Sequence, residues 1–217
     1  MVTVSGVMIG LVETAEVPQE VARLRHQFAD RIVSLDETAW DEASWCSGWQ
    51  VRDVLAHLVK NAESTPRSLI SDLLRGGFRA DHSVNKAAKR LRGVPVTELA
   101  DRLRRAADER LRSGGSSKPF GMGDVVVHSA DAFRPLGVDI DLPSDVAASV
   151  LDAYWHRARA VVRAAPHSGH RLVATDLDWS RGSGTEIRGM TIDLVLFVAN
   201  RRQVLPRLEG PGLGVLR

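Results

Sequence analysis

The chain has 217 residues, of which 44% are hydrophobic and 26% are charged, and its formal net charge is +2. This length fits one large domain, or one domain with a small appendage, and the composition is that of a globular protein with a real core. The basic residues are spread along the chain without a dense run, which argues against nucleic-acid binding. The single cysteine, Cys46, excludes an intramolecular disulfide and fits a reducing compartment.

No apolar run has the length of a membrane span. Residues 1–12 lack the basic leader and the cleavage site of a signal peptide, and we expect them to form a short strand or a poorly ordered arm. The sequence therefore predicts a cytoplasmic protein that binds no membrane.

Apolar residues at helical spacing predict most of the chain between residues 18 and 161 to be helical. A capping box of the form Ser-x-x-Gln is predicted at Ser47–Gln50, before a helix that reaches about residue 62. A flexible break is expected at 113–117, with a loop that runs on to Gly123. The expected helices span 18–35, 51–62, a piece from 66 to about 76, 95–111, a helix around 124–134, and 144–161, and their long members are typical of a bundle.

The end of the chain has a different pattern. Residues 170–176 predict a strand, Gly182–Gly184 a hairpin turn, and residues 185–188 the returning strand. Residues 190–205 are apolar at helical spacing and predict a last helix. We therefore expect a mainly α fold in a single domain over residues 1–217, with a four-helix bundle at about 18–165 and a small β-hairpin and an additional C-terminal helix at about 166–206.

A candidate metal site lies in the helix around residue 128. Asp124 and His128 are four residues apart, so they share one helix face, and Asp131 lies close to that line. A carboxylate and an imidazole at this spacing can close on one ion. The alternative is a solvated polar stripe that carries an ordinary histidine.

His57 is the candidate for a third ligand. It lies beside the apolar stripe of its helix, where a side chain can point into a bundle cavity, although a boundary histidine bonded to a neighbour has the same pattern. Two imidazoles and one carboxylate suit a catalytic Zn²⁺ site with an open position, and also suit Ni²⁺ or Fe²⁺.

Two motifs together carry a family resemblance: Trp45-Cys-Ser-Gly-Trp-Gln-Val-Arg-Asp-Val-Leu-Ala-His57-Leu and Asp124-Val-Val-Val-His128-Ser-Ala-Asp131-Ala-Phe-Arg134-Pro-Leu-Gly. In content, order and separation they resemble the DinB/YfiT-like superfamily. More narrowly, they resemble the metal-binding domain of the mycothiol-dependent maleylpyruvate isomerase family. The resemblance covers about residues 18–162.

The resemblance implies a DinB-like four-helix bundle that binds a divalent metal, usually zinc, through His57, Asp124 and His128. The isomerase has Glu where this chain has Asp124, a shorter ligand. Asp131 is then a candidate to orient a ligand imidazole, or to pair with Arg134 or Arg52, and Arg134 a candidate to bind a carboxylate. The end of the chain shows no match to the isomerase's separate C-terminal domain, which argues against maleylpyruvate itself as the substrate.

The implied function is that of an enzyme that uses mycothiol as a thiol cofactor. A metal lowers the pKa of a bound thiol, and the thiolate adds to a small electrophile, giving cis–trans isomerisation or S-transfer. The alternatives are a non-catalytic metal- or ligand-binding bundle with a stress or regulatory role, and a metal-dependent hydrolase. A homodimer is a further expectation.

Two features near Cys46 are interpreted as structural. Cys46 lies near a helix start but has no histidine adjacent in sequence, so it is not expected to be the nucleophile. Trp45 and Trp49 are expected to pack the bundle end, with lining of a pocket mouth as the alternative.

Overall fold

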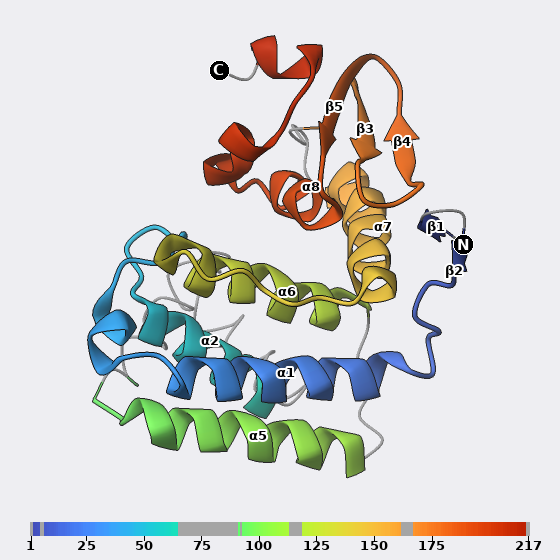
Figure 1. Ribbon diagram of the computed structural model, residues 1–217. Coiled ribbons are helices and arrows are strands. Elements are labelled where there is room, and N and C mark those ends of the chain that lie inside the picture. Colours follow the sequence, from blue (N-terminus) through green and yellow to red (C-terminus); the bar gives the residue numbers. More distant parts are fainter. Residues whose placement is uncertain are drawn as a thin grey trace. The chain divides into compact units, whose positions relative to one another are not determined.

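The computed structural model describes residues 2–4, 7–64, 91, 93–112, 119–161 and 167–215 (Figure 1). The chain divides into two compact units. The helical unit consists of residues 18–117 and 128–140, and the mixed unit consists of residues 1–17, 118–127 and 141–217. The sequence predictions for the helical piece from Pro66 and for the break at 113–117 lie outside the described residues.

The helical unit is built from amphipathic helices whose apolar faces meet. It contains α1 (Val17–Val33), the 3-10 turn η1 (Glu37–Asp41), α2 (Val51–Glu63), α5 (Val96–Arg112), the end of α6 (Pro119–Phe133), and the 3-10 turn η2 (Arg134–Leu136). Helices α2 and α5 pack against each other, and Phe28 of α1 packs against Phe133 of α6 with ring centroids 5.0 Å apart. Burying such side chains is the main source of stability for helices of this length.

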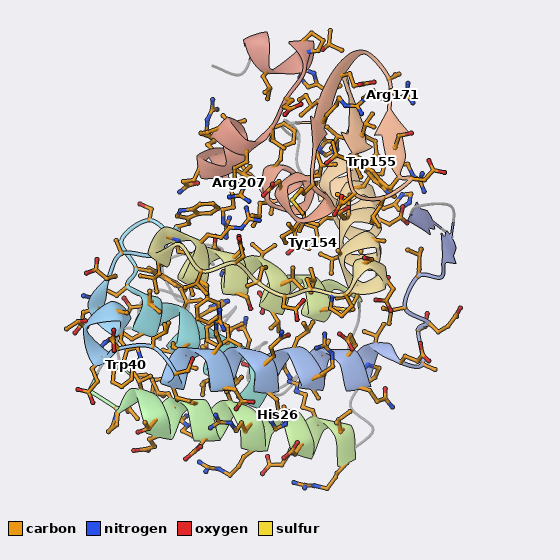
Figure 2. All side chains as sticks on the ribbon, in the orientation of Figure 1. His26, Trp40, Tyr154, Trp155, Arg171 and Arg207 are labelled. Atoms are coloured by element: carbon orange, nitrogen blue, oxygen red, sulfur yellow. The ribbon has the colours of Figure 1, made fainter. Side chains whose placement is uncertain are left out.

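Ion pairs join α5 to its neighbours at the surface. Arg104 contacts Asp30 of α1 at 2.7 Å, and Arg102 contacts Glu63 of α2 at 2.7 Å. The hydrogen bond to Asp30 raises the pKa of Arg104, and the hydrogen bond to Glu63 raises the pKa of Arg102. His26 of α1, labelled in Figure 2, lies 2.8 Å from Asp108 of α5. These partly exposed pairs align the helices and contribute little to stability each.

The starts of α2 and α6 differ from the predictions. The capping contact at α2 involves Gln50 and Asp53, not Ser47 and Gln50: the Asp53 carboxylate accepts the N–H of Gln50 at 2.9 Å. Helix α6 begins at Pro119, where we expected a loop to Gly123. Proline is favoured in the first turn of a helix because its missing N–H has no partner there anyway.

The mixed unit combines short strands with two helices. The hairpin β1 (Val2–Val4) and β2 (Val7–Ile9) occupies the segment where a strand was one alternative. Helix α7 (Ser144–Val161) packs against α8 (Thr191–Val198). The sheet contains β3 (His170–Ala174), β4 (Ser180–Gly182) and β5 (Thr185–Gly189) in the order β4-β3-β5, followed by the 3-10 turns η3 (Arg202–Arg207) and η4 (Pro211–Val215).

The pairing of this sheet corrects one prediction. The turn at Gly182–Gly184 exists, but β5 runs parallel to β3, and the strand antiparallel to β3 is β4. The chain therefore passes from one edge of β3 to the other within a few residues. Gly182 and Gly184 have φ of +89° and +109°, and a Cβ at either would overlap a backbone carbonyl just before or at the start of β3. Only glycine accommodates this crossing.

The C-terminal helix is shorter than predicted. Helix α8 ends at Val198, not near Leu205. Asn200 has φ +62°, and the N–H of Arg201 donates to the carbonyl of Leu196 at 2.8 Å. This is the left-handed C-terminal motif, in which Asn is the commonest substitute for Gly.

The predicted fold class is confirmed, because the described chain is mainly helical and carries one small three-stranded sheet. Among the described residues, every helix is too short or too polar to cross a lipid bilayer.

Candidate metal centre

His57 is held in place by the packing of α2. It is 8% exposed and lies between buried apolar neighbours, including Ala56 and Leu58. Its Nε2 lies 2.9 Å from Nδ2 of Asn61, one turn further along the helix. An amide nitrogen only donates, so Nε2 accepts in this contact, and an ion that binds the Nε2 lone pair would replace Asn61 there.

Helix α6 presents Asp124, His128 and Asp131 along one side. Asp131 is fully buried, and its Oδ2 lies 3.0 Å from Nδ1 of His128, whose side chain is 15% exposed. The Nδ1–H of a neutral imidazole can donate to this carboxylate, which leaves the lone pair on Nε2. A carboxylate behind a ligand histidine fixes the tautomer and the ring orientation, as at many metal centres. Asp131 thus has the contact expected of an orienting residue.

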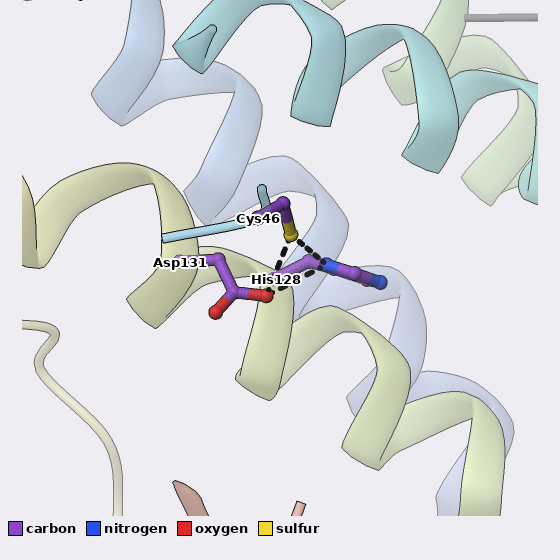
Figure 3. Close-up of side chains that lie close together, drawn as sticks. All are labelled: Cys46, His128 and Asp131. Atoms are coloured by element: carbon purple, nitrogen blue, oxygen red, sulfur yellow. Dashed lines mark hydrogen bonds and ion pairs between the residues drawn. The ribbon is translucent and has the colours of Figure 1, made fainter. Parts of the chain in front are cut away.

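The loop between η1 and α2 brings Cys46 to the same place. The N–H of Trp45 donates to the backbone carbonyl of Asp131 at 2.8 Å, which ties the loop to α6. Gly48, with φ +74°, allows the tight turn that follows Cys46. Figure 3 shows the result: Sγ of Cys46 lies 3.1 Å from Oδ2 of Asp131 and 3.7 Å from Nδ1 of His128.

Aromatic rings surround the two histidines. The rings of His57 and His128 meet edge to face, with centroids 4.5 Å apart. The Trp49 ring lies 5.3 Å from His57 and 6.3 Å from His128, centroid to centroid. Trp49 therefore contacts both candidate ligands. The Trp45 ring lies 6.0 Å from the guanidinium carbon of Arg134.

The candidate ligands fit a divalent metal. His57, Asp124 and His128 each offer one ligand atom, and these atoms lie within 4.8 Å of one another. Two nitrogens and one oxygen at this separation match the donor set of catalytic zinc sites. Asp124 and His128 lie one turn apart on the same continuous helix, which fixes the spacing between them. A second group, Cys46, His128 and Asp131, meets the same distance limit.

Arg52 and Arg134, the predicted partners of Asp131, make other contacts. Arg52, a candidate partner of Asp131, pairs with Asp41 at 2.8 Å. Asp131 contacts His128 and Cys46 instead. Arg134 follows α6 directly, in η2, where its guanidinium lies near Trp45.

Cys46 is the residue that sequence reasoning underestimated. It has no histidine beside it in sequence, but the fold brings it to one 82 residues away. The only signal in the sequence was its position just before a helix whose histidine was itself a candidate.

The bundle thus brings the histidines of α2 and α6 into contact, and the second of them belongs to an Asp-x-x-x-His pair. Residues 21–116 match the family model described as the mycothiol maleylpyruvate isomerase N-terminal domain. The match confirms the predicted family for this segment. No curated protein matches the chain.

Two solved structures resemble most of the chain in fold. They are crystal structures of the mycothiol-dependent maleylpyruvate isomerase and of a mutant in which a histidine is replaced by alanine. Each is 14% identical, with a TM-score of 0.60 over 91% of this chain and 92% of the solved chain. At this coverage the common fold extends far beyond residue 116. The likeness in fold therefore includes the part of the chain where the sequence shows no match to the isomerase's C-terminal domain.

Proposed function

We propose that this protein is a mycothiol-dependent isomerase of small unsaturated electrophiles, with a divalent metal held by His57, Asp124 and His128. The observation that carries the proposal is the contact of the two histidine rings, 4.5 Å apart, with His57 inside the segment that matches the isomerase family. The favoured ion is zinc, with nickel or iron as alternatives.

When bound, such an ion lowers the pKa of a thiol at its open position, so that the thiolate is available at neutral pH. The protein's own residues hold and shield this position. Asp131 accepts the Nδ1 proton of His128 and fixes the ring. Trp49 covers both imidazoles, while the partial exposure of His128 leaves access for a thiol. Arg134 supplies a cation for a carboxylate of substrate or thiol.

The name of the solved relatives suggests the first substrate. The fold likeness over nearly the whole chain supports maleylpyruvate, which the sequence motifs alone had argued against. The shorter Asp124, in place of the Glu of the isomerase that this chain resembles, favours a related small electrophile as the second choice. A cytoplasmic location and a homodimer stay predictions.

The test combines metal content with turnover. Elemental mass spectrometry on the untagged protein is expected to find about one ion per chain, with the amount greatly reduced in His57→Ala and His128→Ala. Isomerisation of maleylpyruvate is expected to require mycothiol and to fall at least about 100-fold in both variants, since both lose a direct ligand. His156→Ala is the matched control, because that histidine is 69% exposed on α7.

The other outcomes separate the alternatives. Activity without any thiol would indicate a hydrolase, and thiol conjugates that accumulate would indicate an S-transferase. A metal-loaded protein that turns over no thiol or electrophile would support a binding or regulatory bundle. Absence of metal, even after reconstitution, would remove the proposal.

A further inference from the structure

His128 takes part in two ligand groups, one through each ring nitrogen. The group of the proposed function uses Nε2, as argued from the contact between Nδ1 and Asp131. On the other side, Nδ1 faces Sγ of Cys46 and Oδ2 of Asp131 (Figure 3). The proposed function uses Asp131 only to orient the ring and leaves Cys46 without a role.

The distances within this second group fit a coordination shell. Zn–S bonds of about 2.3 Å and Zn–N and Zn–O bonds of about 2.0–2.1 Å in a tetrahedron separate the ligand atoms by roughly 3.3–3.6 Å. The observed separations are 3.7 Å for Sγ to Nδ1, 3.1 Å for Sγ to Oδ2, and 3.0 Å for Nδ1 to Oδ2. A bound ion therefore needs shifts of only a few tenths of an ångström.

The supports of the three ligands are rigid and lie in one unit. His128 and Asp131 share α6, and Asp131 is fully buried. The loop that carries Cys46 is held by the N–H of Trp45 on the Asp131 carbonyl and by the N–H of Ser44 on the Trp49 carbonyl, at 2.8 and 2.9 Å. Cys46 and His128 are both partly exposed, which gives an ion a route from solvent.

We infer that Cys46, Asp131 and Nδ1 of His128 form a second metal site, for a soft divalent cation such as Cd²⁺ or Zn²⁺. The thiolate of Cys46 gives this site a preference for soft cations. The group of His57, Asp124 and His128 has no sulfur ligand and lacks this preference. A neutral imidazole carries one lone pair, on one nitrogen only. The two groups therefore compete for His128, and one chain binds one ion at a time.

The experiment uses Co²⁺, whose bonds to thiolate give a charge-transfer band in the near ultraviolet. Cys46 is the only cysteine in the chain, so in a thiol-free reductant any such band comes from Cys46. His57→Ala removes the competing group and leaves the second group intact. We expect this variant to bind one Co²⁺ with the band, and the double variant His57→Ala with Cys46→Ser to lose the band. The affinity for Cd²⁺ is expected to fall at least about tenfold with Cys46→Ser.

A Co²⁺ complex of His57→Ala without the band, or failure of that variant to bind Co²⁺, would overturn the inference. If His57→Ala does not fold, the comparison is made on the wild-type chain with saturating Cd²⁺, against Cys46→Ser. The thiolate band must then appear in the first and be absent from the second, and its absence from both would overturn the inference equally. The two proposals are tested separately. Absence of the thiolate band would not change the result of the mycothiol turnover assay, and absence of turnover would not change the thiolate band.

Discussion

Asp131 is the residue on which the tautomer of His128 depends. Its carboxylate is fully buried, and Oδ2 receives both the His128 Nδ1 contact and the Cys46 thiol contact. Burying a carboxylate is costly unless its oxygens accept hydrogen bonds. The contacts with His128 and Cys46 therefore stabilise the buried Asp131, and Asp131 in turn orients His128.

Asp131→Asn tests this orienting role. The amide keeps the shape of the side chain, but an NH₂ group at the Oδ2 position cannot accept the Nδ1 proton. We expect zinc affinity to fall about 10–100-fold with little change in helix content, measured by competition with a chromophoric chelator. Asp108→Asn, at an exposed pair with His26, is the control. An affinity within twofold of the wild type would show that Asp131 does not position His128.

Single residues also show where the sequence was informative about the site. The i, i+4 spacing of Asp124 and His128 depends only on helix geometry, so it could be predicted from the chain alone. The approach of Cys46 to His128 depends on the turn at Gly48 and on the Trp45 contact with α6, which are tertiary features. No periodicity carries that information, and the nearest ligands in space are 82 and 85 residues away in sequence.

At the scale of elements, α6 packs closely against α7 at Gly123, within the mixed unit. A Cβ at Gly123 would overlap the ring of Tyr154 on α7, which Figure 2 labels, whereas one at Gly121 would meet nothing within 4 Å. The two glycines therefore have different reasons to be present, although both lower the helix propensity of the segment.

Gly123→Ala and Gly121→Ala make a matched pair on this helix. Gly123→Ala is expected to lower the free energy of unfolding by about 1–3 kcal/mol, because the Tyr154 ring must move. Gly121→Ala is expected to raise it by up to about 1 kcal/mol through helix propensity. Chemical denaturation measures both. Equal effects of the two substitutions would show that α6 and α7 do not pack at Gly123.

The C-terminus of helix α8 depends on the backbone conformation of a single residue. Asn200 adopts φ +62°, which is strained for residues other than Gly and Asn. We expect Asn200→Ala to lower the unfolding free energy by about 1–2 kcal/mol and Asn200→Gly to leave it nearly unchanged. Thermal unfolding of the two variants side by side measures the difference. If both have the stability of the wild type, the left-handed residue does not determine where α8 ends.

The errors in predicting the elements have a common physical cause. The apolar stripes of α1, α2, α5 and α7 are long, so their period is unambiguous and the helices could be predicted. Strand β4 has only three residues, Ser180–Gly182, too few to show alternation. In the chain β4 follows β3 and pairs antiparallel to it, so β5 runs parallel to β3 at the opposite edge, and only the sheet itself reveals that. The end of α8 likewise depends on one backbone angle at Asn200.

At the scale of the whole molecule, the two units share helix α6, and the histidines of the candidate centre, His57 and His128, both belong to the helical unit. The helices that carry them are far apart in sequence. An ion that both histidines bind would therefore cross-link α2 to α6 only in the folded state. Binding of this kind stabilises the native chain by mass action, because the unfolded chain offers no preformed site.

Removal of the ion should therefore lower the melting temperature. At a free zinc concentration of 100 times the dissociation constant, the native state gains about 2.7 kcal/mol. For a chain of this size, 1 kcal/mol corresponds to about 2–4 °C, so chelation is expected to lower Tm by about 5–11 °C. The same treatment of His128→Ala is expected to change Tm by less than about 2 °C, since that variant lacks a ligand of both groups. Scanning calorimetry with and without chelator measures both shifts. An equal shift in the wild type and in His128→Ala would place the stabilising ion elsewhere in the chain, and no shift in the metal-loaded wild type would show that the ion does not join α2 to α6.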